Sequence, residues 1–115
     1  MNIKELKSYL GCDDAFLILL MQKFIDEVNE IVATINTAAA VAEWGVVKTN
    51  AHKMLSSVRI FEMKEIIAIL EKLEMEAESG KNTDIIKTKV KELSAHTEKI
   101  ISDMAVSLQK IKSTQ

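Results

Sequence analysis

The side chain in this sequence best suited to chemistry is the imidazole of His52. A neutral imidazole is a competent nucleophile near neutral pH and needs no neighbouring base to activate it. His52 lies in a segment whose apolar residues recur every three or four positions and centre near Ala51 and Met54. At about 100° per residue, His52 points roughly 140° away from that centre, toward solvent or a partner protein. The pattern therefore predicts a reactive nitrogen on the outer face of a helix.

Polar and small side chains accompany this imidazole on the outward strip. Arg59, two turns later, is able to reach back along the strip because helical side chains lean toward the N-terminus. Ser56, one turn later, offers a hydroxyl group and leaves room for a docking protein. Lys48 leans away from His52, and Lys53 lies roughly 100° around the helix. If His52 accepted a phosphoryl group, these residues would supply donors for the new negative charge, with Arg59 the best placed.

The sequence does not support other catalytic or metal sites. The three glycines are isolated, so there is no glycine-rich phosphate loop. With two histidines and no pair of Glu-x-x-His motifs, neither a zinc site nor a di-metal bundle site is expected. His96 lies beside an apolar stripe without cationic neighbours and is interpreted as structural or idle. Glu71, Glu74 and Glu78 share one helix face, interpreted as a solvated acidic surface rather than an acid–base site. We expect this chain to bind no metal and no cofactor.

Composition and charge narrow the class of protein. The chain has 115 residues, 48% of them hydrophobic and only 4% aromatic, with no proline, which favours one aliphatic helical core. A net charge of −2 argues against nucleic-acid binding. Cys12 is the only cysteine, and the apolar run Ala15–Met21 is too short to span a bilayer. We expect residues 1–115 to form a single domain of a cytoplasmic, monomeric protein that binds no membrane.

Five segments carry helical periodicity of apolar residues. They are Asn2–Leu10, a long segment from Asp13 or Asp14 to about Ala39, Glu43–Phe61, Met63 to a glycine cap at Gly80, and a segment from Asn82 or Thr83 to Ile111. Short connections force sequential helices to pack antiparallel. The sequence therefore predicts an all-α fold: an antiparallel up-down-up-down four-helix bundle with a short additional N-terminal helix.

The run Ala51-His52-Lys53-Met54-Leu55-Ser56-Ser57-Val58-Arg59, continued by Leu70-Glu71-Lys72-Leu73-Glu74, resembles the histidine-containing phosphotransfer (HPt) domain family. The similarity extends to the turn at Ala42–Gly45 and to the acidic start of the long helix. HPt domains are helical bundles that relay a phosphoryl group between aspartates of receiver domains, without autonomous catalytic activity. The resemblance implies that His52 is the phosphoacceptor and that Ser56 fills the small position one turn later. It implies a response-regulator receiver domain, a hybrid histidine kinase or both as partners, with magnesium on the receiver only.

Two positions depart from the pattern of the family. Leu55 stands three residues after His52, where the family usually has a lysine near the phosphoryl group. Glu62 stands ten residues after His52, where the family tends to have a glycine at the turn between helices. Arg59 and Lys53 are the evident substitutes for the lysine. Leu55 would instead add apolar area to a docking surface around the imidazole.

The departure at Leu55 favours an alternative function, a helical adaptor that is never phosphorylated and acts by protein–protein interaction. Such an adaptor would be either a degenerate HPt-like domain or an unrelated helical bundle. A bundle that binds a small molecule has little support, because Thr97 is the only polar residue inside a predicted apolar stripe.

Overall fold

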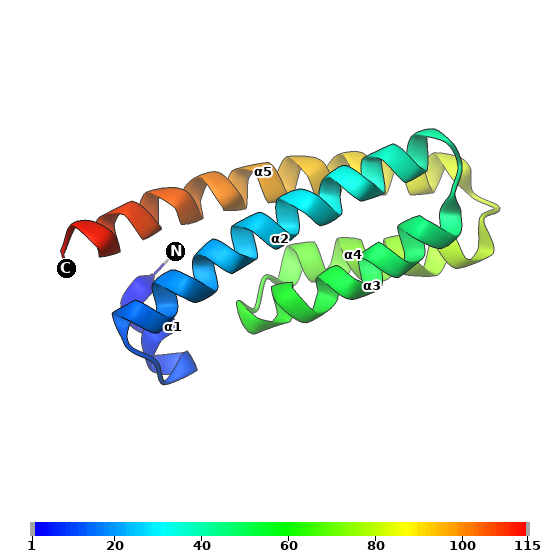
Figure 1. Ribbon diagram of the computed structural model, residues 1–115. Coiled ribbons are helices and arrows are strands. Elements are labelled where there is room, and N and C mark those ends of the chain that lie inside the picture. Colours follow the sequence, from blue (N-terminus) through cyan, green and yellow to red (C-terminus); the bar gives the residue numbers. More distant parts are fainter. Residues whose placement is uncertain (1, 115) are drawn as a thin grey trace.

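The computed structural model describes residues 2–114 and contains five α-helices in this part of the chain (Figure 1). They are α1 (Ile3–Leu10), α2 (Asp14–Ala40), α3 (Trp44–Ile60), α4 (Lys64–Ser79) and α5 (Thr83–Ser113). The all-α fold is confirmed, with one short N-terminal helix and four long helices packed as a bundle. Each predicted segment corresponds to one helix, with boundaries that differ by one or two residues.

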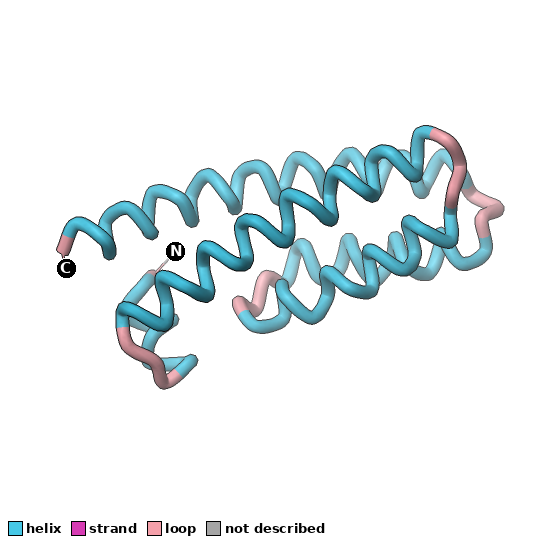
Figure 2. Tube along the Cα trace, viewed as in Figure 1, coloured by secondary structure: helices cyan, strands magenta, loops and turns pink. Residues whose placement is uncertain are grey.

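The four long helices form a closed ring of neighbours. Helix α2 packs against α3 and α5, and α4 packs against α3 and α5. The longest helices, α2 and α5, run side by side over most of the 50 Å length of the molecule, and the shorter α3–α4 hairpin lies along them (Figure 1). Short loops make every connection between the helices (Figure 2). Helix α1 lies beside the start of α2 and has no buried residue.

The core between the helices is aliphatic, as the composition predicts. Its largest fully buried side chains include Leu17, Met21, Ile35, Met54, Ile66, Leu70, Leu73, Ile86, Leu93 and Met104. Thr97, the polar residue predicted inside a stripe, is buried, and its hydroxyl donates a hydrogen bond to the carbonyl of Leu93. This bond removes the cost of burying an unpaired hydroxyl group. Thr97 therefore has a structural partner.

Three helix ends are capped by local contacts or by a glycine, as predicted for Gly80, and a fourth end is arranged differently. The carboxylate of Asp13 accepts a hydrogen bond from the backbone of Phe16, and Gly11 and Gly80 end α1 and α4 at φ 63° and 64°. Asn82 occupies the N-cap position of α5 but makes no capping bond with its side chain. Its amide donates instead to Oε2 of Glu76, at 3.3 Å. The α4–α5 connection is thus held by a side-chain contact back to α4.

The turn between α3 and α4 accounts for one departure from the family pattern. Helix α3 ends at Ile60, one residue before the predicted Phe61, and α4 begins at Lys64. Between them Glu62 adopts φ 51°, in the left-handed region that favours glycine. The backbone conformation that would suit a glycine is therefore kept, although the residue is a glutamate.

Among residues 2–114, no helix combines the length and the apolar character needed to cross a lipid bilayer.

Candidate functional site

The imidazole of His52 faces solvent from the middle of α3. Its side chain is 71% exposed, whereas Ala51 and Met54 beside it are fully buried. The predicted outward orientation of the ring is therefore confirmed. Because α3 packs on both α2 and α4, the helix presents the ring from a backbone that is fixed on two sides.

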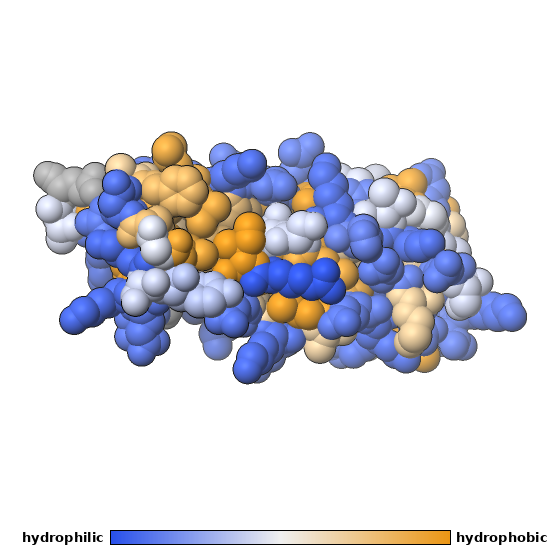
Figure 3. Space-filling model, turned by 90° about the horizontal axis from the view of Figure 1, so that it is seen from below, coloured by the Kyte–Doolittle hydropathy of each residue, from blue (hydrophilic) through white to orange (hydrophobic). Residues whose placement is uncertain are grey.

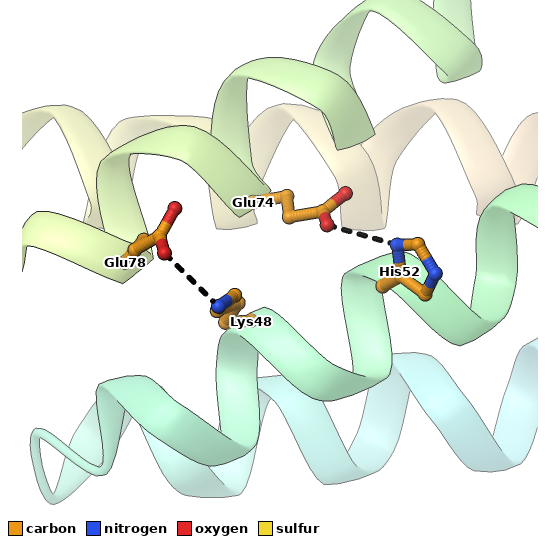
Figure 4. Close-up of polar contacts among 4 residues, drawn as sticks. All are labelled: Lys48, His52, Glu74 and Glu78. Carbon is orange, nitrogen blue, oxygen red and sulfur yellow. Dashed lines mark hydrogen bonds and ion pairs between the residues drawn. The ribbon is translucent and has the colours of Figure 1, made fainter.

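A carboxylate of α4 fixes the orientation of this ring. Nδ1 of His52 lies 2.8 Å from Oε1 of Glu74, whose side chain is only 26% exposed (Figure 4). An ionised carboxylate only accepts hydrogen bonds, so Nδ1 is the donor and carries the proton of the neutral ring. The lone pair then resides on Nε2, which lies on the side of the ring away from Glu74 (Figure 4). The contact selects the tautomer whose outer nitrogen is nucleophilic.

A second contact repeats this arrangement one turn away. Nζ of Lys48 donates to Oε1 of Glu78 at 3.2 Å, again from α3 to α4 (Figure 4). The 22 residues that separate His52 from Glu74 and the 30 that separate Lys48 from Glu78 are both centred on Met63. Residues equidistant from the turn of an antiparallel hairpin lie at the same level, which explains both pairs. Lys48 is therefore directed toward Glu78, in keeping with its predicted lean away from the imidazole.

Seven residues line a shallow depression around the ring, on the seam between α3 and α4. They are His52, Leu55, Arg59, Glu71, Glu74, Met75 and Glu78. The depression thus joins the ring to Arg59, the predicted phosphoryl partner, which is exposed. It also places three carboxylates on the α4 side of the ring, so this side is acidic. The glutamates are more than a solvated surface, because two of them bind side chains of α3.

The expectation that Leu55 adds apolar area to a docking surface is wrong. Its side chain is only 2% exposed and belongs to the core. The reason is that α3 packs against two helices, which buries a wider arc than a single apolar stripe. Leu55 forms the floor of the depression and offers little surface to a partner.

The other predicted site residues lie on different sides of the ring. Ser56 and Lys53 are exposed. Ser56 lines a separate groove between α2 and α3, together with Leu20, Lys23, Phe24, Glu27, Ser57, Ile60 and Phe61. In the view from below, apolar side chains gather toward α1 and the end of α3, and the face over the start of α3 is mainly hydrophilic (Figure 3). The groove that begins at Ser56, one turn after His52, thus includes apolar side chains such as Leu20, Ile60 and Phe61.

Sequence reasoning missed the role of Glu74. Its position in the Leu73-Glu74 pair was part of the resemblance, but the wheel of α4 alone assigned it to a solvated face. The equal spacing of His52 and Glu74 from the predicted turn was the signal that could have paired them. His96, for comparison, has Nδ1 3.6 Å from Oε2 of Glu65, an ion pair only when the ring is protonated. Within residues 2–114, no group of three or more histidine, cysteine or acidic residues is arranged to hold a metal ion.

Comparison with known protein families agrees with this geometry. Residues 19–105 match the family described as Hpt domain, and the match includes the whole of α3 and α4. Since it covers more than half of the chain, the chain belongs to the Hpt domain family, whose members are phosphoryl carriers in phosphorelays. Searches of curated proteins and of solved structures each found no match.

Proposed function

We propose that this protein is a phosphorelay carrier that accepts a phosphoryl group on Nε2 of His52 and donates it to another protein. The observation that carries the proposal is the state of the ring: Nδ1 is bonded to Glu74, and the exposed Nε2 has a free lone pair. Membership of the Hpt domain family supports the same reaction. We also propose that the protein works in the cytoplasm.

The proposed partner is a receiver domain phosphorylated on an aspartate. The Nε2 lone pair attacks phosphorus in line, the bond from phosphorus to the aspartyl oxygen breaks, and the aspartate leaves as a carboxylate. Magnesium would be held by the receiver, where it would polarise the acyl phosphate, and this chain would supply only the imidazole. A hybrid histidine kinase that carries such a receiver is equally suited. The bundle contributes rigid presentation of one nitrogen.

Within the chain, Arg59 is the cation best placed to bind the transferred group. It lines the same depression as the ring, and the structure shows no ion pair for its guanidinium among residues 2–114. Lys48 is engaged by Glu78, which leaves it a weaker candidate. Lys53 follows His52 directly in the sequence and is exposed. Its side chain leaves the helix roughly 100° around the axis from the imidazole. Ser56 keeps the neighbouring turn small enough for a receiver to approach.

The test is transfer of labelled phosphate from a panel of phosphorylated receiver domains. We expect acid-labile, alkali-stable label on the wild-type protein and on His96→Gln, the matched control at the second histidine. We expect no label on His52→Gln, because the variant lacks the 71% exposed imidazole whose Nδ1 is bonded to Glu74. Equal label on His52→Gln would assign the acceptor to a different residue.

Two observations favour a second function, an adaptor that is never phosphorylated. Leu55 replaces the lysine of the family, and the α4 side of the ring carries carboxylates that repel a phosphate. The absence of label with every receiver, combined with stable binding to one of them, would establish the adaptor and overturn the carrier.

A further inference from the structure

The contact between Glu74 and Nδ1 has a consequence for the phosphorylated ring. We propose that Glu74 is a positioning residue that keeps the proton on Nδ1 while Nε2 carries the phosphoryl group, so that the carrier is poised for rapid onward transfer rather than for storage. The inference rests on the proposed function and adds a determinant of how long the phosphohistidine persists.

The proton is retained because of what Nδ1 faces. When Nε2 carries phosphorus, the neutral form of the ring has a lone pair on Nδ1. At 2.8 Å from Oε1 of Glu74, that lone pair would face the lone pairs of a carboxylate. With the proton kept, the same contact is a charge-assisted hydrogen bond between an imidazolium and a carboxylate. The partly covered position of Glu74, 26% exposed, limits screening of this interaction by water.

The other charged groups near the ring act on this balance from both helices. On α4 they are Glu71 and Glu78, and on α3 they are Lys48, Lys53 and Arg59. Glu78 is paired with Lys48, so their charges largely cancel at the ring. Glu71 adds negative charge on the side of Glu74 and therefore also favours the protonated ring. The lysine that the family usually has near the phosphoryl group is replaced here by the uncharged, buried Leu55.

The proton decides how easily the nitrogen–phosphorus bond breaks. In onward transfer an aspartate carboxylate, or water in hydrolysis, attacks phosphorus, and the electron pair of the Nε2–P bond returns to Nε2. With Nδ1 protonated, the leaving group is a neutral imidazole that already carries its proton. Without that proton, the leaving group is an imidazolate anion, which is a much poorer one. In the proposed cycle the same proton stays on Nδ1 throughout, and no proton transfer to or from solvent is needed.

Replacing Glu74 by glutamine separates the two states of the ring. The side chain keeps its size and its place on α4, but its amide group is able to donate a hydrogen bond to an unprotonated Nδ1. The glutamine therefore stabilises the phosphorylated ring without a proton on Nδ1, whereas the carboxylate of Glu74 disfavours that form. The matched control is Glu78→Gln, which removes one charge from the same face of α4 without touching the imidazole.

The experiment uses the full chain phosphorylated on His52 with potassium phosphoramidate, a small donor that needs no receiver. After the donor is removed at pH 8, the lifetime of the phosphohistidine is followed for the wild type, Glu74→Gln and Glu78→Gln. Ring nitrogen NMR of the phosphorylated proteins reports whether Nδ1 carries a proton. Circular dichroism verifies that each variant is folded.

We expect the phosphohistidine of Glu74→Gln to last roughly fivefold longer or more than that of the wild type, a small part of the roughly hundredfold that a positioned proton contributes to a rate. We expect a protonated Nδ1 in wild type and an unprotonated one in Glu74→Gln. The Glu78→Gln variant should resemble wild type in both measurements. Equal lifetimes for wild type and Glu74→Gln, or an equal change in Glu78→Gln, would overturn the inference. If phosphoramidate phosphorylates His52 but no receiver domain donates a phosphoryl group to His52 or accepts one from it, the proposed function is wrong. If His52 is not phosphorylated at all, both the proposed function and this inference are wrong.

Discussion

The indole of Trp44 lies against the backbone of Gly80, so that the start of α3 packs on the end of α4. A Cβ atom added at Gly80 would come within 3.0 Å of Cδ1 of Trp44. Gly80 also adopts φ 64°, a conformation that residues with a side chain rarely take. Two independent requirements therefore disfavour a larger residue at this position. The contact holds the open end of the hairpin that carries His52 and Glu74.

Replacing Gly80 by alanine should destabilise the fold more than the same change at Gly11. Gly11 has a similar φ, 63°, but has nothing within 4 Å of an added Cβ atom. We expect Gly11→Ala to cost about 1 kcal/mol through the left-handed backbone alone. Gly80→Ala should cost about 1–2 kcal/mol more because the indole must move. Urea unfolding of the two variants measures the difference, and equal losses would show that the Trp44 contact is unimportant.

Replacing Glu62 by glycine should stabilise the protein. Glu62 adopts φ 51° in the α3–α4 turn, which is strained for a residue with a side chain. Relief of that strain, less the greater freedom of glycine in the unfolded chain, should raise the free energy of unfolding by about 0.5–1 kcal/mol. The control is Glu65→Gly in the first turn of α4, where glycine should lower stability by about 0.5–1 kcal/mol. Thermal unfolding of both variants measures whether each change raises or lowers stability. A loss of stability in Glu62→Gly would show that the backbone at Glu62 is not strained.

The helices and the outward face of His52 were predictable because both follow from local periodicity. Apolar residues at steps of three and four define each helix, and the wheel then gives the direction of the ring. The capping at Asp13 and the glycine end at Gly80 were predictable for the same reason, since they depend on residues close in sequence. The Hpt domain resemblance rested on a short run around the histidine and extends, in the family match, over residues 19–105.

The burial of Leu55 and the partner of His52 depend on how α4 lies against α3, which no single helix reveals. A wheel of α3 shows one stripe, but contact with both α2 and α4 buries a second edge that includes Leu55. The rotation of α4 about its own axis decides whether Glu74 meets solvent or the imidazole. Periodicity gives the rotation of α4 only to within the angular width of its apolar stripe. A rotation smaller than that width determines whether Glu74 contacts His52.

Glu76 should make the stability of the bundle depend on acidity. The pKa of its carboxyl group lies below its ordinary value, first because Lys72 donates a hydrogen bond at 2.9 Å and then because of the amide of Asn82. A lowered pKa stabilises the fold at pH values above the ordinary pKa of glutamate, and the contribution is lost as the pH falls through the lowered value. The difference in unfolding free energy between wild type and Glu76→Gln should therefore be largest near neutral pH and should shrink in acid.

Urea unfolding at a series of pH values measures this difference for Glu76. The control is Glu98→Gln, which removes one carboxylate from an exposed position on α5 and leaves the contacts of Glu76 in place. A difference for Glu76→Gln that grows as the pH falls would reverse the expected sign and exclude the proposed cause.

Replacing Leu55 by lysine, the residue that the family usually has there, should lower the stability of the fold and speed the acceptance of a phosphoryl group. Leu55 is 2% exposed, so Leu55→Lys removes buried apolar area, although a lysine stem is able to cover part of it. We expect a loss of about 1–3 kcal/mol in the free energy of unfolding. The ammonium group would emerge in the depression that holds His52 and Arg59, where it stabilises the phosphoryl group as it arrives. Acceptance from a phosphorylated receiver should therefore become several-fold faster. Leu55→Met, which conserves volume without charge, should leave the rate unchanged, and a similar rate in both variants would show that a cation at position 55 does not reach the ring.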